Sequence, residues 1–380
     1  MNLFRSTLLL GVTVTLVAAV SASDKDVEKQ LKADTDRVVK ESMKSHHVPG
    51  MMVVVVAEGK VILNKSYGED PRLSKPPDDH TMYDLGKVSE ALTGFAAMRL
   101  VDQGKIGLKD PISKYLKGLP ESWQAVTVEQ LLTQSSGIPE LPPGKETFEE
   151  AVTQVGKGPL PFTPGAKRYY RSSNADILGQ VVASASSEKY VNAMSTNLFK
   201  PLKMDNTGDL QKLVRWHLRI ASSADANANV NLNRSSAAMG PVIANKVTVT
   251  EPELIAQVKK MVPDYSVPSQ GLASTPQDMT KFSSAVLSGE MLKSQSSQFF
   301  SMNAPGWEVC MAGMDTVLRA SGLVINNGGV VVHVLPDKKA ALILMWSLNS
   351  DSTNDMLLTP SQEILSGAYG LPKDGWLCTR

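Results

Sequence analysis

Two strand-forming segments near opposite ends of the chain constrain the fold most. Residues 51–68, MMVVVVAEGKVILNKSYG, predict two strands around a turn at Glu58-Gly59. Residues 317–349 predict further strands, and the hydrophobic spacing between the two segments is mostly helical. Because no clean linker separates them, we expect both ends to share one antiparallel sheet with a helical part inserted. Two independent domains are the alternative.

This order predicts a mixed α/β (α+β) fold. The chain has 380 residues, of which 42% are hydrophobic, so it can bury a large core. Residues 221–239, ASSADANANVNLNRSSAAM, contain few large apolar groups and predict a surface loop. The expected boundaries are a single domain over 23–380, with an α/β part of about 24–90 and 270–372, a helical insert of about 91–210 and a loop of about 221–245.

The first 22 residues have the pattern of a secretory signal peptide. Arg5 precedes a short apolar run, and Val20-Ser21-Ala22 supplies the small residues that signal peptidase requires. The run is too short for a membrane span, and no later stretch is long and apolar enough for one. We therefore expect a secreted, extracellular protein with no membrane span.

Two further features fit export. The two cysteines, Cys310 and Cys378, form a disulfide or remain as two thiols, and the sequence leaves both readings open. Asn64 and Asn233 each begin an Asn-x-Ser sequence and are candidate glycosylation sites.

Charge and motif content exclude several classes of function. The 39 basic and 38 acidic residues give a net charge of +1, which indicates no nucleic-acid partner and no anionic membrane. No glycine-rich phosphate loop or cluster of metal ligands is present, so we expect no cofactor and no metal site.

Several strings, in order along the chain, carry a family resemblance. They are VPG before the first strand, DLG-x-V-S-x-ALTG, VDQGKIGLKDPISKYL, TVEQLLTQSSGIP, the PG and SN of PGAKRYYRSSNADILG, LFKPLKMDNTG and QGLASTPQDMTKF. Together they resemble the serine beta-lactamase-like family, which includes class C beta-lactamases, D,D-peptidases of the peptidase S12 group, related esterases and animal lactamase-like proteins. The resemblance covers nearly all of the mature chain and implies that family's fold.

The same resemblance implies three catalytic sites, and this chain departs at each of them. The family uses Ser-x-x-Lys at a helix start, Tyr-x-Asn on a loop and Lys- or His-x-Gly on a strand. The corresponding residues here are Lys87 and Glu90, Ser172 with Asn174, and Ala320 with Gly322.

These substitutions predict that no catalytic residue remains. Lys87 and Glu90 lie one helical turn apart, so we expect an ion pair, and the carboxylate favours the ammonium over the free amine that could attack. Ser172 cannot act as a base near neutral pH. Ser89, Ser135 and Ser136 have no evident base beside them. The literal Ser-x-x-Lys at residues 186–189 falls between two predicted helices and is expected by chance.

Three hypotheses of function follow. The first is a secreted, catalytically inactive protein that binds or forms part of an extracellular matrix; lactamase-like proteins of mollusc shell matrix suggest this role by resemblance. The second is a secreted serine hydrolase, an esterase or peptidase with non-standard catalytic residues. The third is a protein that binds a small carboxylate through Lys87 in the old acyl pocket. The implied partners are extracellular matrix components or a small carboxylate, and the oligomeric state stays open.

Overall fold

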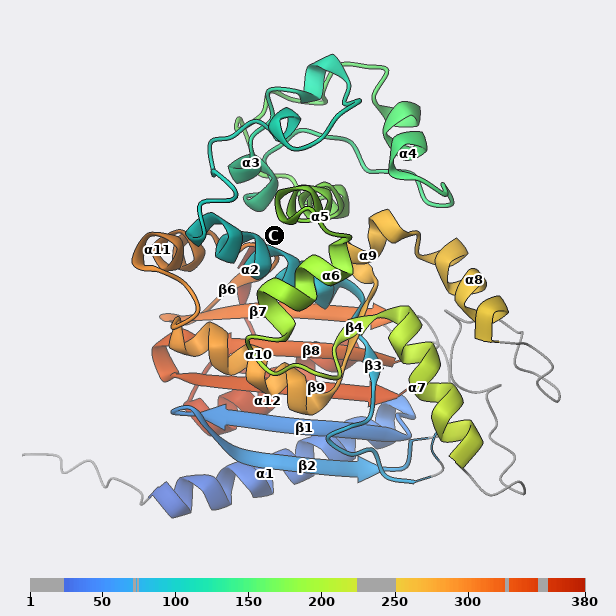
Figure 1. Ribbon diagram of the computed structural model, residues 1–380. Helices are drawn as coiled ribbons and strands as arrows, with labels where there is room; N and C mark the ends of the chain where they lie inside the picture. The colour runs from blue at the N-terminus through green and yellow to red at the C-terminus, as the bar shows by residue number, and fades with distance from the viewer. Residues whose placement is uncertain are drawn as a thin grey trace, which may run out of the picture.

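Strands from both ends of the chain form one antiparallel sheet, as predicted (Figure 1). The computed structural model describes residues 24–70, 73, 75–223, 251–324, 328–347 and 355–379. The strand order is β10-β6-β7-β8-β9-β1-β2. The strands are β1 (Gly50–Ala57), β2 (Lys60–Gly68), β6 (Glu308–Ala312), β7 (Asp315–Val324), β8 (Gly328–Leu335), β9 (Ala340–Ser347) and β10 (Leu377–Thr379).

Strand β1 explains why the sheet is covered on both faces. It pairs with β2 on one side and with β9 on the other. Because successive side chains of a strand point to opposite faces, Met52 and Val54 enter one hydrophobic core while Val53 and Val55 enter another. The unbroken apolar run of this strand therefore contributes side chains to both hydrophobic cores.

One core lies between the sheet and two terminal helices, α1 (Asp24–His46) and α12 (Asp355–Tyr369). Leu31, Val38 and Val39 of α1 are buried against the sheet. Figure 1 shows both helices on the side of the sheet away from the helical part.

The other core joins the sheet to the helical part. Its centre is α2 (Ser89–Asp102), which is buried along most of its length and packs against α5. The remaining helices are α3 (Val128–Leu132), α4 (Phe148–Val155), α5 (Ser172–Ser186), α6 (Tyr190–Met194), α7 (Leu210–Ser223), α8 (Glu251–Met261), α9 (Val267–Gln270), α10 (Pro276–Ser288) and α11 (Ser294–Asn303). A small sheet has the order β3 (Tyr83–Asp84), β5 (Leu272–Ser274), β4 (Gly208–Asp209).

The predicted turn at Glu58-Gly59 is confirmed, and both residues have a positive φ between β1 and β2. Thr127 caps α3 in a capping box with Gln130. The disulfide between Cys310 and Cys378, which the sequence left open, is formed, and it links directly opposed residues of β6 and β10.

Other predictions fall partly outside the described residues. The signal peptide, the Asn233 sequence and most of the predicted loop lie there, while α7 extends to Ser223 within the predicted loop range. Asn64 is described: it lies exposed on β2 and donates a hydrogen bond to Asp79. None of the helices in the described ranges is both long enough and apolar enough to span a bilayer.

Candidate functional site

The site forms where a short 3-10 turn, η1 (Gly86–Val88), approaches β7. A Cβ atom at position 322 would lie 2.0 Å from the Leu85 carbonyl oxygen and 3.0 Å from the Lys87 nitrogen, so only glycine allows this approach. Gly86 itself adopts a positive φ of 47°. Two glycines thus hold Lys87 at the start of α2, beside the strand.

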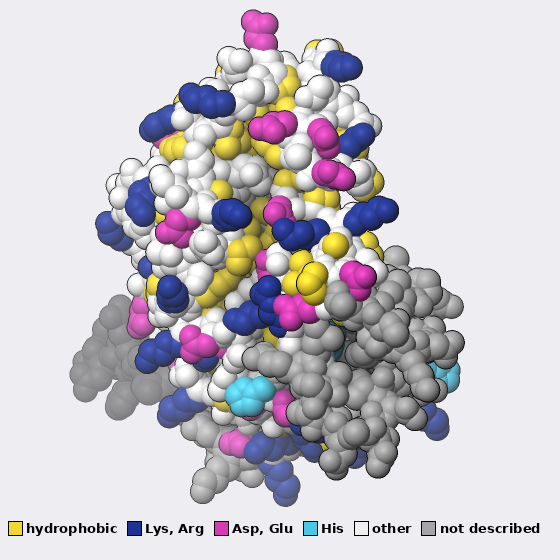
Figure 2. Space-filling model, turned by 45° about the vertical axis from the view of Figure 1, so that its right-hand side comes forward, with side chains coloured by type: hydrophobic (Ala, Val, Ile, Leu, Met, Phe, Trp, Pro, Cys, Tyr) yellow, Lys and Arg dark blue, Asp and Glu magenta, His cyan; other side chains and the backbone are white. Residues whose placement is uncertain are grey.

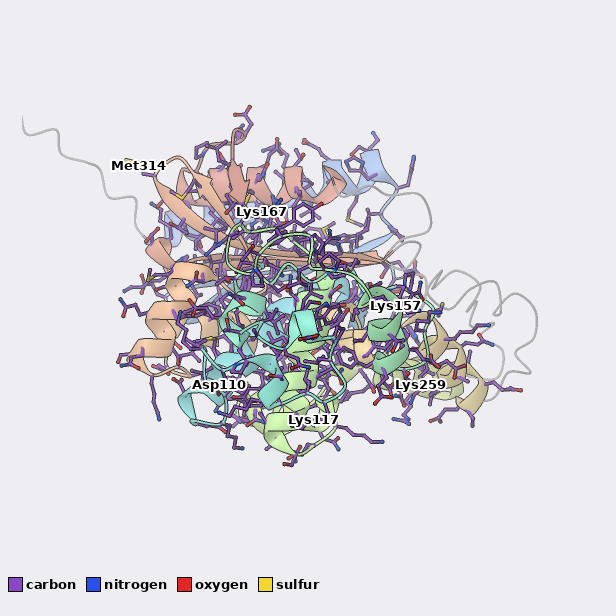
Figure 3. The ribbon with its side chains drawn as sticks, turned by 90° about the horizontal axis from the view of Figure 1, so that it is seen from above. Asp110, Lys117, Lys157, Lys167, Lys259 and Met314 are labelled. Carbon is purple, nitrogen blue, oxygen red and sulfur yellow. A yellow bond between two sulfur atoms is a disulfide. The ribbon has the colours of Figure 1, made fainter. Side chains whose placement is uncertain are left out.

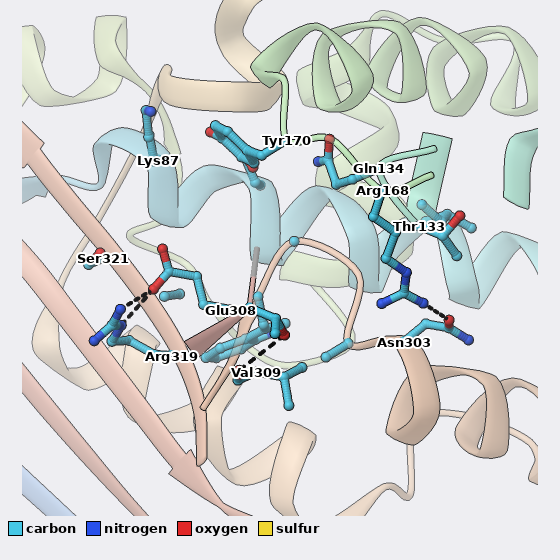
Figure 4. Close-up of a pocket in the computed structure, with 17 residues that line it drawn as sticks. Lys87, Thr133, Gln134, Arg168, Tyr170, Asn303, Glu308, Val309, Arg319 and Ser321 are labelled. Carbon is cyan, nitrogen blue, oxygen red and sulfur yellow. Dashed lines mark hydrogen bonds and ion pairs between the residues drawn. The ribbon is translucent and has the colours of Figure 1, made fainter. Parts of the chain in front are cut away.

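A pocket of about 60 Å³ lies at this junction (Figure 4). Three separate regions of the sequence line it, as the family resemblance led us to expect. Lys87 and Glu90 come from η1 and α2, Ala320 and Ser321 come from β7, and Tyr170 comes from the loop before α5. Further lining residues are Gln134, Arg168, Asn303, Glu308, Arg319 and Thr379.

Tyr170 connects the two charged residues that replace the family's serine and lysine. Its hydroxyl donates a hydrogen bond of 2.6 Å to Glu90 Oε1. Its ring centroid lies 5.0 Å from Lys87 Nζ, within the range of a cation–π interaction. The ammonium and the carboxylate therefore contact different parts of one side chain.

In the part of the chain that the structure describes, Lys87 and Glu90 do not form the predicted ion pair. Glu90 is buried, with 5% of its surface exposed, and its carboxylate accepts from Tyr170, whereas Lys87 is exposed. The tyrosine provides both a hydrogen-bond donor and a π face, and the two charges remain separate. The ion pair was predicted from the spacing of Lys87 and Glu90 along one helix, and this spacing takes no account of Tyr170.

Ser172, which the resemblance places at the family's tyrosine position, does not line the pocket. Ser172 begins α5, and its hydroxyl donates to the carboxylate of Glu140, outside the pocket lining. Tyr170, two residues earlier, provides the aromatic hydroxyl in the pocket. Tyr170 was not among the predicted site residues, and the family's Tyr-x-Asn spacing does not identify it, because Ser172 follows it at that spacing.

Asn174 supports the loop instead of lining the pocket. Its amide donates a 2.6 Å hydrogen bond to Gln134 Oε1, and its oxygen accepts a 2.6 Å hydrogen bond from Ser136. Gln134, in turn, has a positive φ of 56° and lines the pocket. Asn174 therefore fixes the loop that carries Gln134.

The alternative serine nucleophiles do not face a base in the pocket. Ser89 is buried and accepts a hydrogen bond from the Leu272 backbone. Ser135 bonds to Thr133, and Ser136 bonds to Asn174. The described lining includes one serine, Ser321, whose hydroxyl makes no hydrogen bond to a described residue.

A buried ion pair forms part of the wall. Arg319 on β7 bonds through Nε to Glu308 Oε2 at 2.6 Å, and their side chains are 12% and 9% exposed (Figure 4). Burial lowers the pKa of Arg319. At the mouth, Arg168 donates a 2.7 Å hydrogen bond to Asn303.

Two buried aspartates lie near the site. Burial raises the pKa of Asp84 to about 7, although the Gly86 amide bonds its carboxylate at 2.9 Å and opposes that rise. Burial, followed by the negative charges of Glu90 and Glu140, raises the pKa of Asp176 well above its usual value. Among the described residues, no group of three or more His, Cys, Asp and Glu side chains is placed to hold a metal ion.

A larger open groove of about 1310 Å³ lies between the helices α4, α6, α7 and α8. It contains none of the predicted site residues, and its lining includes charges of both signs, such as Lys189, Arg215, Asp209 and Glu251. Figure 2, with the right-hand side of Figure 1 turned forward, shows apolar side chains flanked by both signs of charge.

Comparisons with known proteins agree with this architecture. A sequence model of the family described as Beta-lactamase matches residues 35–362. Protein flp of Staphylococcus aureus (strain N315) is 29% identical over 190 residues, which cover 45% of this chain and 37% of that protein. A beta-lactamase of Escherichia coli (strain K12) is 26% identical over 195 residues, 50% of this chain and 52% of that protein. The chain therefore spans about half or less of the length of these relatives.

A solved structure supports the same fold. The octameric penicillin-binding protein homologue from Pyrococcus abyssi superimposes with a TM-score of 0.66 at 19% identity, over 88% of this chain and 76% of that chain.

Proposed function

This chain belongs to the beta-lactamase family, and we propose that it uses the family's fold and pocket for binding, without serine-based acyl transfer. Acyl transfer on this fold needs a hydroxyl nucleophile with a proton acceptor within hydrogen-bond reach. Lys87 occupies the nucleophile's place, and the acceptor's place holds Glu90, which is bonded to Tyr170 at 2.6 Å. That hydrogen bond is the observation that carries the proposal.

The competing hypothesis is a serine hydrolase with rebuilt chemistry. Ser321 is the serine available in the described lining, and no base contacts its hydroxyl. Covalent labelling by a fluorophosphonate tests the two hypotheses. We expect no label on the folded protein at a concentration that labels an active esterase. A label that is lost in Ser321→Ala, with Ser172→Ala as the matched control, would establish the hydrolase.

A specific observation favours a small carboxylate as the ligand. Lys87 Nζ lies at the pocket beside the ring of Tyr170 and forms no ion pair with a described residue. A lysine ammonium without an acidic partner is able to bind the carboxylate of a ligand. Thermal-shift measurements with acetate and benzoate should show stabilisation that disappears in Lys87→Ala and persists in Lys157→Ala, which changes an exposed lysine outside the pocket. An equal shift in both variants would reject this role.

We also propose that the protein is secreted and is part of an extracellular matrix, a role that lactamase-like proteins of mollusc shell matrix suggest. Residues 1–22 and the Cys310–Cys378 disulfide support export, since disulfides persist in oxidising compartments. Recovery of the protein from decalcified matrix would agree with this location. Its detection solely inside cells would contradict it.

A further inference from the structure

Four positively charged side chains lie on or beside the loop between α4 and α5. Lys167, Arg168 and Arg171 belong to this loop, in the stretch KRYYR, and Lys87 Nζ lies 5.0 Å from the ring centroid of Tyr170 in the same stretch. Lys87 and Arg168 both line the pocket, and Figure 4 shows them projecting from different elements. We call these four residues, with Phe162, Tyr169 and Tyr170, the basic–aromatic surface.

Aromatic rings hold three of these charges in place. Lys167 Nζ lies 5.0 Å from the Phe162 centroid and 5.8 Å from the Tyr169 centroid. The Arg171 guanidinium lies 4.7 Å from the Tyr169 centroid, and Lys87 lies over Tyr170. Cation–π contacts orient a charge but do not neutralise it. The positive charge therefore remains available to a ligand.

Acidic side chains do not neutralise this surface. None of its four basic residues forms an ion pair within the described ranges, whereas Lys65, Lys114 and Arg319 each pair with a carboxylate elsewhere. The acids that line the pocket or bond to Ser172 have other contacts: Glu90 accepts from Tyr170, Glu140 accepts from Ser172, and Glu308 pairs with Arg319. A chain with a net charge of +1 thus has a local excess of positive charge, which composition alone does not reveal.

We propose that the basic–aromatic surface binds an acidic polysaccharide through its sulfate or carboxylate groups. This inference rests on the proposed function, in which a secreted and non-catalytic protein acts by binding. Clustered Lys and Arg side chains recognise polyanions of high charge density. Arg supplies paired donors that match planar or tetrahedral oxyanions, and exposed Lys supplies mobile point charges.

Two other polyanions fit the surface less well. Single-stranded nucleic acid binds by stacking bases on free aromatic faces, but Lys167 and Arg171 already lie over the Tyr169 ring. Membrane binding requires apolar side chains that insert into the interface. Tyr169, 50% exposed, is the one strongly exposed large hydrophobic residue on the described part of this loop.

The test measures the affinity of the full mature protein for heparin, a sulfated polysaccharide, and for alginate, a carboxylated one. Lys167→Glu/Arg171→Glu should weaken binding by about tenfold or more at about 0.1 M salt, and the parent's affinity should fall as salt rises. The matched control is Lys117→Glu/Lys157→Glu, two exposed lysines that lie apart from Lys167 in Figure 3. The control should retain binding within about twofold, because its lysines lie away from this surface; its net charge equals that of the test variant, so a difference between the two reports the position of the charges.

Several outcomes would overturn the proposal. They are no binding of either polysaccharide, an equal loss in both variants, or tighter binding of single-stranded DNA or phosphatidylserine vesicles than of either polysaccharide. If the charge-reversed variant does not fold, Lys167→Gln/Arg171→Gln replaces it. Ester hydrolysis by the parent would reject the proposed function and leave the binding result unchanged, so the two failures are distinguishable.

Discussion

The hydroxyl of Tyr170 donates a 2.6 Å hydrogen bond to Glu90 while the ring of the same residue contacts the Lys87 ammonium. In this arrangement one tyrosine contacts both charged residues at the start of α2. Lys87 and Glu90, at the positions of the family's catalytic serine and lysine, are therefore held by Tyr170.

Removing the Tyr170 hydroxyl should destabilise the protein. Tyr170→Phe keeps the ring beside Lys87 but removes a donor from a buried carboxylate, so we expect a loss of about 1–3 kcal/mol in the free energy of unfolding. Urea denaturation measures it. Tyr169→Phe, at an exposed ring, is the control and should change stability by less than about 0.5 kcal/mol. Equal effects would contradict this role.

The Arg319–Glu308 pair should show strong coupling. Glu308→Leu leaves the largely buried guanidinium of Arg319 without its partner, and we expect the free energy of unfolding to fall by about 3–5 kcal/mol. Glu308→Leu/Arg319→Met removes both charges and should cost less than the sum of the single substitutions. A double-mutant cycle in urea measures the coupling, and additive losses would show that the pair does not act as a unit.

The disulfide should stabilise the edge of the sheet. Cys310→Ala/Cys378→Ala opens a connection between residues 68 apart, and we expect a loss of about 2–4 kcal/mol. The parent with added dithiothreitol should show a similar loss. An unchanged denaturation midpoint in both cases would contradict a stabilising role of the disulfide.

Two buried groups should give opposite pH dependences. Burial, followed by the charge of Arg319, lowers the pKa of His333 from 6.5 to about 3. The contribution of His333 to the free energy of unfolding therefore falls as the pH drops from about 6.5 towards 3. The pKa of Asp84 is raised from 3.8 to about 7. The contribution of Asp84 to the free energy of unfolding therefore falls as the pH rises from 3.8 to about 7. Between about pH 4 and 6.5 the two effects oppose each other.

Asp84→Asn removes one of these opposing effects. Its stability should therefore decrease more steeply than that of the parent as the pH falls from about 6.5 to 4, by about 1 kcal/mol per pH unit. Thermal unfolding across this range measures the slope. Identical slopes for parent and variant would contradict the assignment to Asp84.

Hydrophobic periodicity and turn signals were sufficient to predict the sheet, because they depend on local chemistry. Residues 51–68 predicted two strands around a turn at Glu58-Gly59, and these are β1 and β2. The β10 strand was not predicted, because three exposed residues carry no hydrophobic pattern and depend on their pairing with β6.

The site was predicted less completely than the fold. Lys87, Glu90 and Ala320 do line one pocket, and Gly322 does make a close approach. The position of Tyr170 depends on the path of a loop that Asn174 and Gln134 hold by side-chain hydrogen bonds. No sequence spacing specifies such a path, and the predicted site residues therefore did not include Tyr170. The contact of Lys87 with an aromatic ring instead of Glu90 follows from the same loop.

One measurement tests the central claim most directly: hydrolysis of nitrocefin and p-nitrophenyl acetate by the purified mature protein, beside Lys87→Ser/Glu90→Lys and the control Lys87→Ala/Glu90→Ala. The double replacement places a serine and a lysine one helical turn apart, and Tyr170 already lies beside the second position. We predict background rates for the parent and for the alanine control, and measurable turnover for Lys87→Ser/Glu90→Lys. Turnover by the parent that disappears in Ser321→Ala or Tyr170→Phe would contradict the account.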